Sequence, residues 1–319
     1  MFWQNLESDE KCSSVLSRFG MNRHTPVLVR EVVEYLACGP GKSFLDLTAG
    51  EGGHGEAVLR ATAPDGTWIG TDRDPQAIRN AGEHLSPFGS RVRLEHATFS
   101  EALDRIVPQA AKDLNGALID CGVSSVQLED AARGFSFAQD GPLDMRMDPS
   151  SGVTAREWLH RATEREIADA VFRYGEERFS RRIARRIALA RKEGRLSTTG
   201  DLARAVVGAL PPGERHKKIH PATRAFQAVR IAVNDELAQL EYAVARLIEV
   251  LPAGARLVVI SFHSLEDRIA KTLFQKAQKE GAGRILTRKP VVASPEEVDR
   301  NPRARSAKLR ALEILGGRA

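Results

Sequence analysis

The sequence predicts an α/β protein with a mostly parallel sheet that is interrupted, after its fourth strand, by a helical insertion. Short apolar runs alternate with helical patterns over the first 120 residues, and a glycine-rich stretch follows the first of these runs. After residue 120 the alternation stops, and the next convincing strand begins only at residue 255. Alternating strands and helices are typical of a parallel sheet with helices on both faces.

The glycine-rich stretch at residues 44–55 (FLDLTAGEGGHG) predicts a strand at 44–47, a turn with glycines at 50, 52, 53 and 55, and a helix reaching about residue 62. Glycine lets the backbone turn sharply and approach a ligand, and a helix N-terminus offers free N–H donors. The second predicted strand, 67–71, leads to Asp72, 22 residues after Gly50. Rossmann-like folds bind ribose hydroxyls with an acidic residue at this place. The pattern therefore predicts a nucleotide-type cofactor site.

The remaining elements follow from apolar periodicity and from turn and cap residues. In the first half we expect a helix from Pro26 capped by Thr25, a helix at 76–85 capped by Asp74, a strand at 91–96, a helix at 101–111 and a strand at 116–120. Further helices are expected at 155–160, 164–172, 178–192, 200–210 and 223–251, the last either continuous or broken inside. The chain then predicts a strand at 255–261, a helix at 265–280, a strand at 284–286, an extended basic loop and a strand at 309–315.

The domain organisation follows from where the alternation stops. We expect a disordered tail at 1–22, a cofactor-binding domain made of 23–125 and 222–319, and a helical substrate-recognition insertion at 126–221. The insertion leaves the carboxyl end of the fourth strand, where open α/β sheets bind ligands.

Composition narrows the class of protein and of partner. An apolar content of 42% and a charged content of 28% are ordinary for a globular protein, and neither a membrane span nor a signal peptide is expected. The three cysteines, Cys12, Cys38 and Cys121, lack metal-ligand spacing, so we expect no metal site and a cytoplasmic location. Residues 178–195 carry eight Lys and Arg against one acid, and residues 284–310 carry eight against three. Two basic segments favour a polyanionic partner over a merely solvated surface.

Sequence blocks along most of the chain resemble the MraW/RsmH family. They are HTPVL at 24–28, DLTAGEGGHG at 46–55, GTDRDPQAI at 70–78, DCGVSSVQL at 120–128, RGFSF at 133–137, GPLDMRM at 141–147, YGEER at 174–178, HPATRAFQAVRIAVNDEL at 220–237, SFHSLEDR at 261–268 and NPRARSAKLR at 301–310. The resemblance implies a class I methyltransferase fold that uses S-adenosylmethionine. It also implies transfer of a methyl group to the exocyclic N4 amine of a cytosine in the decoding region of 16S ribosomal RNA. The implied partner is 16S ribosomal RNA within the small ribosomal subunit or a late assembly intermediate. The sequence leaves open whether the protein forms a homodimer.

The resemblance also implies site residues. It assigns the methionine end of the cofactor to Gly52, Gly53 and His54, the ribose to Asp72, and the rest of the pocket to Phe99, Asp120 and Gln127. The sequence departs from the family pattern at Cys121, where Leu is usual, and at Gly55, where Ser is common. We expect altered packing there rather than lost chemistry.

Catalytic candidates lie in two loops, and they are Asp120, Ser124, Ser125, His263 and Glu266. Ser264 with Asp267 as a helix cap is the structural alternative for the polar residues of the second loop. The loop after strand four lacks the aromatic residue that many amine methyltransferases stack on the base, and the sequence leaves both the stacking and the proton-acceptor residue open.

Candidate RNA contacts are Asp144, Arg146, Arg178, Arg182, Arg186, Lys217, Arg303 and Arg305. For Asp144 and Arg146 an internal ion pair is an equal alternative. Arg230, within an apolar helical pattern, is expected to pair internally.

Sequence motifs also bear on other activities. The absence of GxxxxGK[ST] disfavours an ATPase, and the broken GxGxxG spacing disfavours a dehydrogenase. Methylation of DNA or of another RNA shares every argument for the cofactor. A non-catalytic RNA-binding ribosome-assembly factor is disfavoured, because such a protein need not retain both the glycines and Asp72.

Overall fold

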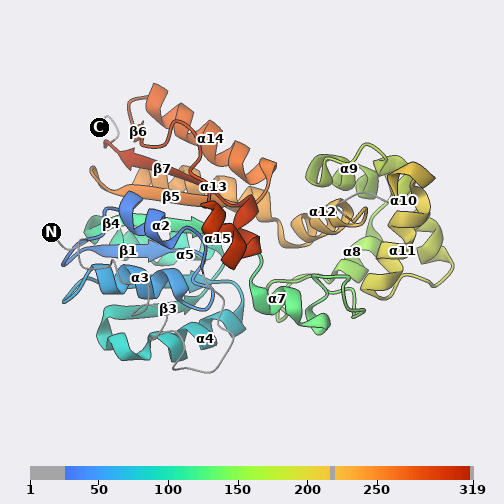
Figure 1. The fold of residues 1–319 in the computed structure, drawn as a ribbon, viewed down its shortest axis with the longest axis horizontal. Helices are drawn as coiled ribbons and strands as arrows, with labels where there is room; N and C mark the ends of the chain where they lie inside the picture. Colours follow the sequence, from blue (N-terminus) through green and yellow to red (C-terminus); the bar gives the residue numbers. More distant parts are fainter. Residues whose placement is uncertain (1–25, 216–219, 317–319) are drawn as a thin grey trace.

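The computed structural model describes residues 26–215 and 220–316. Figure 1 shows two lobes, an α/β lobe built around a sheet and a smaller lobe made of helices. No described helix combines the length and the apolar character that crossing a membrane requires.

One seven-stranded sheet, ordered β3-β2-β1-β4-β5-β7-β6, forms the α/β lobe. Strands β1 to β5 are parallel, and β7 pairs antiparallel with both β5 and β6. The strands are β1 Ser43–Asp46, β2 Trp68–Asp72, β3 Val92–His96, β4 Leu114–Asp120, β5 Arg256–Ser261, β6 Gly283–Ile285 and β7 Lys308–Ile314. Each lies within two residues of its predicted range, so the predicted α/β fold class is confirmed.

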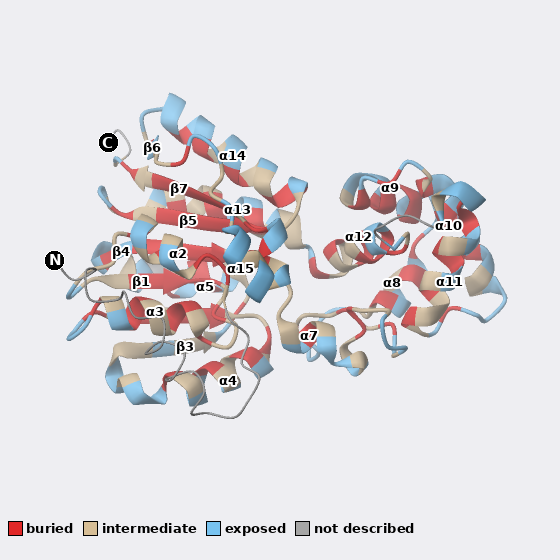
Figure 2. Ribbon diagram, in the orientation of Figure 1, coloured by how far each residue is buried: buried red, intermediate tan, exposed pale blue. Residues whose placement is uncertain are grey.

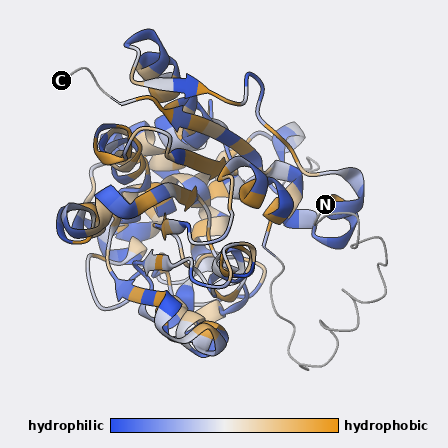
Figure 3. Cartoon of the chain, turned by 90° about the vertical axis from the view of Figure 1, so that its left-hand side faces the viewer, coloured by the Kyte–Doolittle hydropathy of each residue, from blue (hydrophilic) through white to orange (hydrophobic). Residues whose placement is uncertain are grey.

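Helices cover both faces of the sheet. Against one face lie α2 Val29–Tyr35, α3 Gly53–Ala61 and α4 Pro75–Leu85, and against the other lie α5 Phe99–Arg105, α13 Glu236–Val250 and α14 Ser264–Lys279. Neighbouring strand residues alternate between the two cores: Phe44 and Val258 belong to the first, and Leu45 and Val259 to the second. Burial on both sides makes the central strands continuously apolar (Figures 2 and 3).

The helical lobe has its own apolar core, which extends from Leu143 to Val229. Its helices are α8 Ala155–Arg161, α9 Glu164–Gly175, α10 Ser180–Lys192, α11 Thr199–Ala209 and α12 Thr223–Asn234. Because α12 packs against α9, it belongs to this lobe, and the expected domain boundary at 222 is too early. The expected long helix is broken at Asp235, whose φ of 51° ends α12 before α13 begins. We therefore propose Asp235 as the boundary.

Short helices replace several expected loops. They are α7 Ser125–Glu129, α15 Pro295–Arg300 and the 3-10 helix η6 Pro302–Ser306. The Leu28 backbone N–H donates to Glu297 Oε1 of α15 (2.7 Å), so the expected extended basic loop in fact folds against the first described helix.

Two other boundaries differ from the prediction. The expected helix at 101–111 is divided into α5 and α6 Val107–Ala110. The helix expected from Pro26 begins only at Val29, because Leu28 has a φ of 52°. Thr25, Lys217 and the expected tail at 1–22 lie outside the described residues.

Candidate active site

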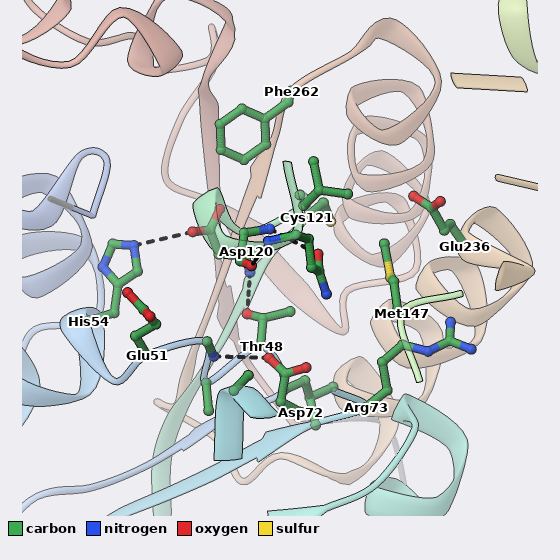
Figure 4. A pocket seen from close by; sticks show the side chains of 18 of the residues that line it. Thr48, Glu51, His54, Asp72, Arg73, Asp120, Cys121, Met147, Glu236 and Phe262 are labelled. Carbon is green, nitrogen blue, oxygen red and sulfur yellow. Dashed lines mark hydrogen bonds and ion pairs between the residues drawn. The ribbon is translucent and has the colours of Figure 1, made fainter. Parts of the chain in front are cut away.

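A cavity of about 190 Å³ lies at the carboxyl ends of the parallel strands. Thr48 follows β1, Asp72 ends β2, Asp120 ends β4 and Phe262 follows β5, and all four line it (Figure 4). The cavity wall also includes Glu236 and residues from both ends of the described chain, such as Pro26 and Arg303. The carboxyl edge of an open α/β sheet is the usual ligand site of such folds, and here it faces the insertion.

The glycine-rich loop and Asp72 meet as predicted. The Gly50 backbone N–H donates to Asp72 Oδ2 (2.9 Å), and Gly50 and Gly52 have φ values of 52° and 84°, which favour glycine. A Cβ on Gly53 would lie 2.5 Å from Pro26 Cγ. Gly53 lines the cavity, whereas Gly52 caps α3 behind it.

Two carboxylates at strand ends have raised pKa values. Burial raises the pKa of Asp72 to about 6, although the backbone N–H groups of Asp74 and Gly50 partly oppose this. Burial also raises the pKa of Asp46 to about 6, and Asp46 Oδ1 accepts from the Thr48 backbone N–H (2.8 Å). Of the two, Asp72 lines the cavity, and a carboxylate with a perturbed pKa in a cavity wall is typical of functional sites.

His54 and Asp120, which both line the cavity, carry buried polar atoms without hydrogen-bond partners among the described residues. His54 Nε2 lies 3.4 Å from Asp120 Oδ2, an ion-pair distance without hydrogen-bond geometry. Neither ring nitrogen of His54 has a hydrogen-bond partner among the described residues, and neither has Asp120 Oδ1. Buried polar groups are normally paired, so these atoms indicate a place where a ligand supplies the partner.

The loop after β4 carries Ser124, Ser125 and Gln127, which all line the cavity. Ser124 and Gln127 form the capping box of α7, and Gln127 Nε2 donates to Asp74 Oδ2 (2.8 Å). Ser125 Oγ accepts from Arg303 Nη1. These contacts hold α7 against α4 and η6.

Phe99 lines the cavity at the start of α5. It is partly buried and packs against the core of the α5–α13–α14 face.

Helix α14, which follows β5, has its N-cap one residue earlier than expected. His263, not Ser264, is the N-cap of α14, and its partner is Glu266, so the alternative with Asp267 is wrong. His263 Nε2 lies 3.0 Å from Glu266 Oε1, and Glu266 Oε2 accepts from the Phe262 backbone N–H (2.7 Å). Glu266 lines the cavity, but His263 is not among the lining residues.

The predicted RNA contacts are mostly remote from this cavity. Asp144 and Arg146 form a two-pronged ion pair (both bonds 2.8 Å), which is the internal alternative. Arg303 lines the cavity, whereas Arg182 and Arg186 line a separate hollow of about 930 Å³ on the helical lobe.

The other two described candidates are exposed. Arg178 stacks on Phe179 at 4.7 Å and pairs with Glu214 (2.7 Å). Arg305 lies exposed in η6.

Glu236 is a lining residue that no direct signal in the sequence identifies. Arg230 Nη2 donates to Glu236 Oε2 (2.7 Å) across the break at Asp235, which confirms the internal pairing expected for Arg230. Because the pair depends on that break, periodicity alone could not find it. Phe262 was also missed, although its position directly after a buried strand is a usable signal.

A model of the MraW methylase family matches residues 21–315. The chain belongs to the MraW methylase family. Among similar curated proteins, each named ribosomal RNA small subunit methyltransferase H, that of Trichlorobacter lovleyi is 48% identical over 308 residues, covering 92% of this chain and 98% of its own. That of Acidobacterium capsulatum is 50% identical over 298 residues, covering 91% and 98%. That of Geobacter sulfurreducens is 48% identical over 308 residues, covering 92% and 99%.

Membership of the methylase family confirms the resemblance carried by the sequence blocks. The Rossmann-like sheet of this methylase, with β7 antiparallel between β5 and β6, is the architecture that the resemblance implied. The departure at Cys121 lies in the cavity wall, where burial raises the pKa of the thiol well above its ordinary value. A neutral thiol there is consistent with a change in packing alone.

Proposed function

We propose that this methylase transfers a methyl group from S-adenosylmethionine to the N4 amine of a cytosine in the decoding region of 16S ribosomal RNA. The observation that carries the proposal is the cavity at the carboxyl edge of the sheet, in which Asp120 Oδ1 and both ring nitrogens of His54 lack hydrogen-bond partners among the described residues. The names of the similar proteins support the ribosomal RNA substrate. The cytosine N4 position rests on the resemblance of the sequence blocks.

The residues of the cavity fit this cofactor. Asp72 offers carboxylate oxygens to ribose hydroxyls, and Phe99 offers an apolar face to adenine. Gly53 lines the wall at the start of α3, and Gly52 caps that helix beside it. His54 can pair with the carboxylate group of the methionine end, and Asp120 and Gln127 complete the wall. When bound, S-adenosylmethionine supplies an electrophilic methyl group on a positively charged sulfur.

The protein must align the amine with this methyl group and receive a proton. The amine nitrogen forms a bond to the methyl carbon while the carbon–sulfur bond breaks, and sulfur keeps the electron pair. The amine loses one proton, for which the free oxygen of Asp120 is the proposed acceptor. Ser124 and Ser125 hold the loop that carries Asp120, and much of the rate enhancement comes from alignment.

The basic residues supply the proposed RNA contacts. A base within folded RNA must be turned out to reach the methyl group, while cations hold the backbone. Arg303 lies at the cavity, and Arg178, Arg182 and Arg186 lie on the helical lobe. We include Arg305 and Lys217 on charge alone, and we assign the Asp144–Arg146 pair to holding its own loop.

Mass mapping of ribosomal RNA tests the proposal. A strain lacking the gene should lose one methyl mark on a cytosine of 16S RNA, and the wild-type gene should restore it. An Asp120→Asn gene should restore little, because the acceptor is neutralised. An unchanged methylation map in the deletion strain would favour a non-catalytic assembly factor, and a lost mark on another RNA would change the substrate.

A further inference from the structure

The base-stacking residue that the loop after β4 lacks lies on a different strand. Residues 120–125 contain no aromatic side chain, so that loop offers no flat surface to a turned-out base. Of the described residues that line the cavity, Phe99 and Phe262 carry phenyl rings. Phe99 begins α5 on the β3 side and packs against the core of the α5–α13–α14 face. Phe262 follows β5, and in Figure 4 Asp120 lies between it and Asp72.

The ring of Phe262 lies directly against the loop that carries Asp120. A Cβ on Gly122 would be 3.1 Å from Phe262 Cε2 and 3.2 Å from Cδ2. The backbone of Gly122 has no positive φ, so glycine serves here to leave space rather than to allow a turn. The ring therefore borders the loop at the cavity wall, and Phe262 itself is half-buried.

A buried carboxylate fixes the backbone that carries the ring. Glu266 Oε2 accepts from the backbone N–H groups of Phe262 (2.7 Å) and His263 (3.2 Å), and Glu266 is 3% exposed. The next residue, Ser264, donates through Oγ to Glu176 Oε2 of the helical lobe (2.8 Å). The turn that positions Phe262 is thus tied both to the cavity wall and to the proposed RNA-binding lobe.

We propose that Phe262 is the residue on which the target cytosine stacks, in a subsite bounded by its ring, Gly122 and Asp120. In this proposal the exocyclic amine of the stacked cytosine is directed to Asp120 Oδ1, which has no hydrogen-bond partner among the described residues. Glu266 and His263 act as positioning residues that hold the ring. The proposal rests on the proposed function, because it assigns part of the same site to its substrate.

Two substitutions of Phe262 test the proposal, because one keeps a flat ring and the other keeps only a similar side-chain volume. Phe262→Tyr keeps a ring and should retain methyl transfer to small-subunit RNA within about threefold. Phe262→Met keeps a similar volume without a flat face and should lower kcat/KM about tenfold or more, the scale of a lost base–aromatic stack. Both variants should bind S-adenosylmethionine as the wild type does in calorimetry. Phe88→Leu, a substitution before β3 and outside the cavity lining, is the matched control.

A second variant changes the loop that the Phe262 ring contacts. Gly122→Ala places a methyl group against the ring, so it should lower methyl transfer while cofactor affinity is kept. Equal activity of the Tyr and Met variants would overturn the proposal and make Phe262 a packing residue. If the wild type binds the cofactor but methylates no ribosomal RNA, the proposed function fails instead.

Discussion

Asp72 and Asp46 are carboxylates at strand ends, and each is held partly or fully out of water. Burial raises both pKa values from 3.8 to about 6. A raised pKa means that the folded protein prefers the protonated acid, so the stabilising contribution is present below the unfolded value and is lost as the pH rises through about 6. A ligand that donates hydroxyl hydrogens to Asp72 prefers the opposite, ionised form.

The affinity for S-adenosylmethionine should therefore fall as the pH drops from 7.5 to 5, with a midpoint near the Asp72 pKa of about 6. Asp72→Asn should weaken binding about tenfold or more at pH 7.5, because hydrogen bonds to a charged acceptor are lost. It should also flatten the pH dependence. Calorimetry at several pH values measures both effects.

Thermal unfolding of the ligand-free protein provides the control for this prediction. The midpoint difference between the wild type and Asp72→Asn should change over pH 4 to 6, with the wild type gaining stability as the pH falls. Unchanged affinity of the variant at pH 7.5 would remove Asp72 from the cofactor site.

The contrast between Asp72 and His263 shows which residues a sequence can identify. Asp72 can be found because the end of a strand and its spacing from Gly50 are both local signals, and the Gly50–Asp72 hydrogen bond agrees. His263 is a catalytic candidate from sequence because it follows a buried strand. Its contact with Glu266 depends on which residue begins α14, and Ser264 is as plausible a cap from sequence.

Helix ends and breaks position most of the cavity wall. The cap of α14 fixes Phe262, the capping box of α7 fixes the loop after β4, and the break at Asp235 brings Arg230 to Glu236. All seven strands were predicted, and most of them are marked by apolar runs bounded by turn residues; β6, with the sequence Gly-Arg-Ile, is not. The short helices α7 and α15 were not, because five or six residues give no periodicity and their ends depend on tertiary contacts.

Substitution of His263 separates capping from catalysis. His263→Asn retains a good N-cap residue and should keep both stability and methyl transfer within about threefold. His263→Ala should lower the free energy of unfolding by about 1 kcal/mol, measured by urea denaturation. A large loss of activity in a stably folded His263→Asn protein would instead show that the imidazole touches the reacting groups.

The two lobes differ in the kind of surface that they present. The α/β lobe holds the cavity, and α10 presents Arg181, Arg182, Arg185 and Arg186 along a hollow on the helical lobe. The end of the strand–helix alternation after residue 120 predicted the two parts, and the basic run at 178–195 predicted a polyanionic partner for the second. The sequence misplaced the boundary, because the apolar face of α12 has the same periodicity whichever lobe it packs against.

Reversing two of these charges tests whether the hollow faces RNA. Arg182→Glu with Arg186→Glu should weaken binding of small-subunit RNA and reduce the slope of log affinity against log salt by about 0.7–0.9 for each phosphate that the variant no longer neutralises. Filter binding at salt concentrations of roughly 50–200 mM, a range in which such effects are large, measures this slope. Arg105→Glu with Arg246→Glu, on α5 and α13 of the other lobe, is the matched control. Equal slopes for the two double variants would show that α10 does not meet RNA.

The position of β7 has a consequence for how the protein is made. Strand β7 follows all the other strands in the chain, yet it lies between β5 and β6. Chains emerge from the ribosome N-terminus first at about 5–20 residues per second, so β5 waits roughly 2–9 s for its neighbour with an open apolar edge. Arg303, which lines the cavity, also emerges during this interval. A nascent copy therefore has neither the β7 neighbour of β5 nor the Arg303 side of the cavity wall until the segment that follows α14 has been made.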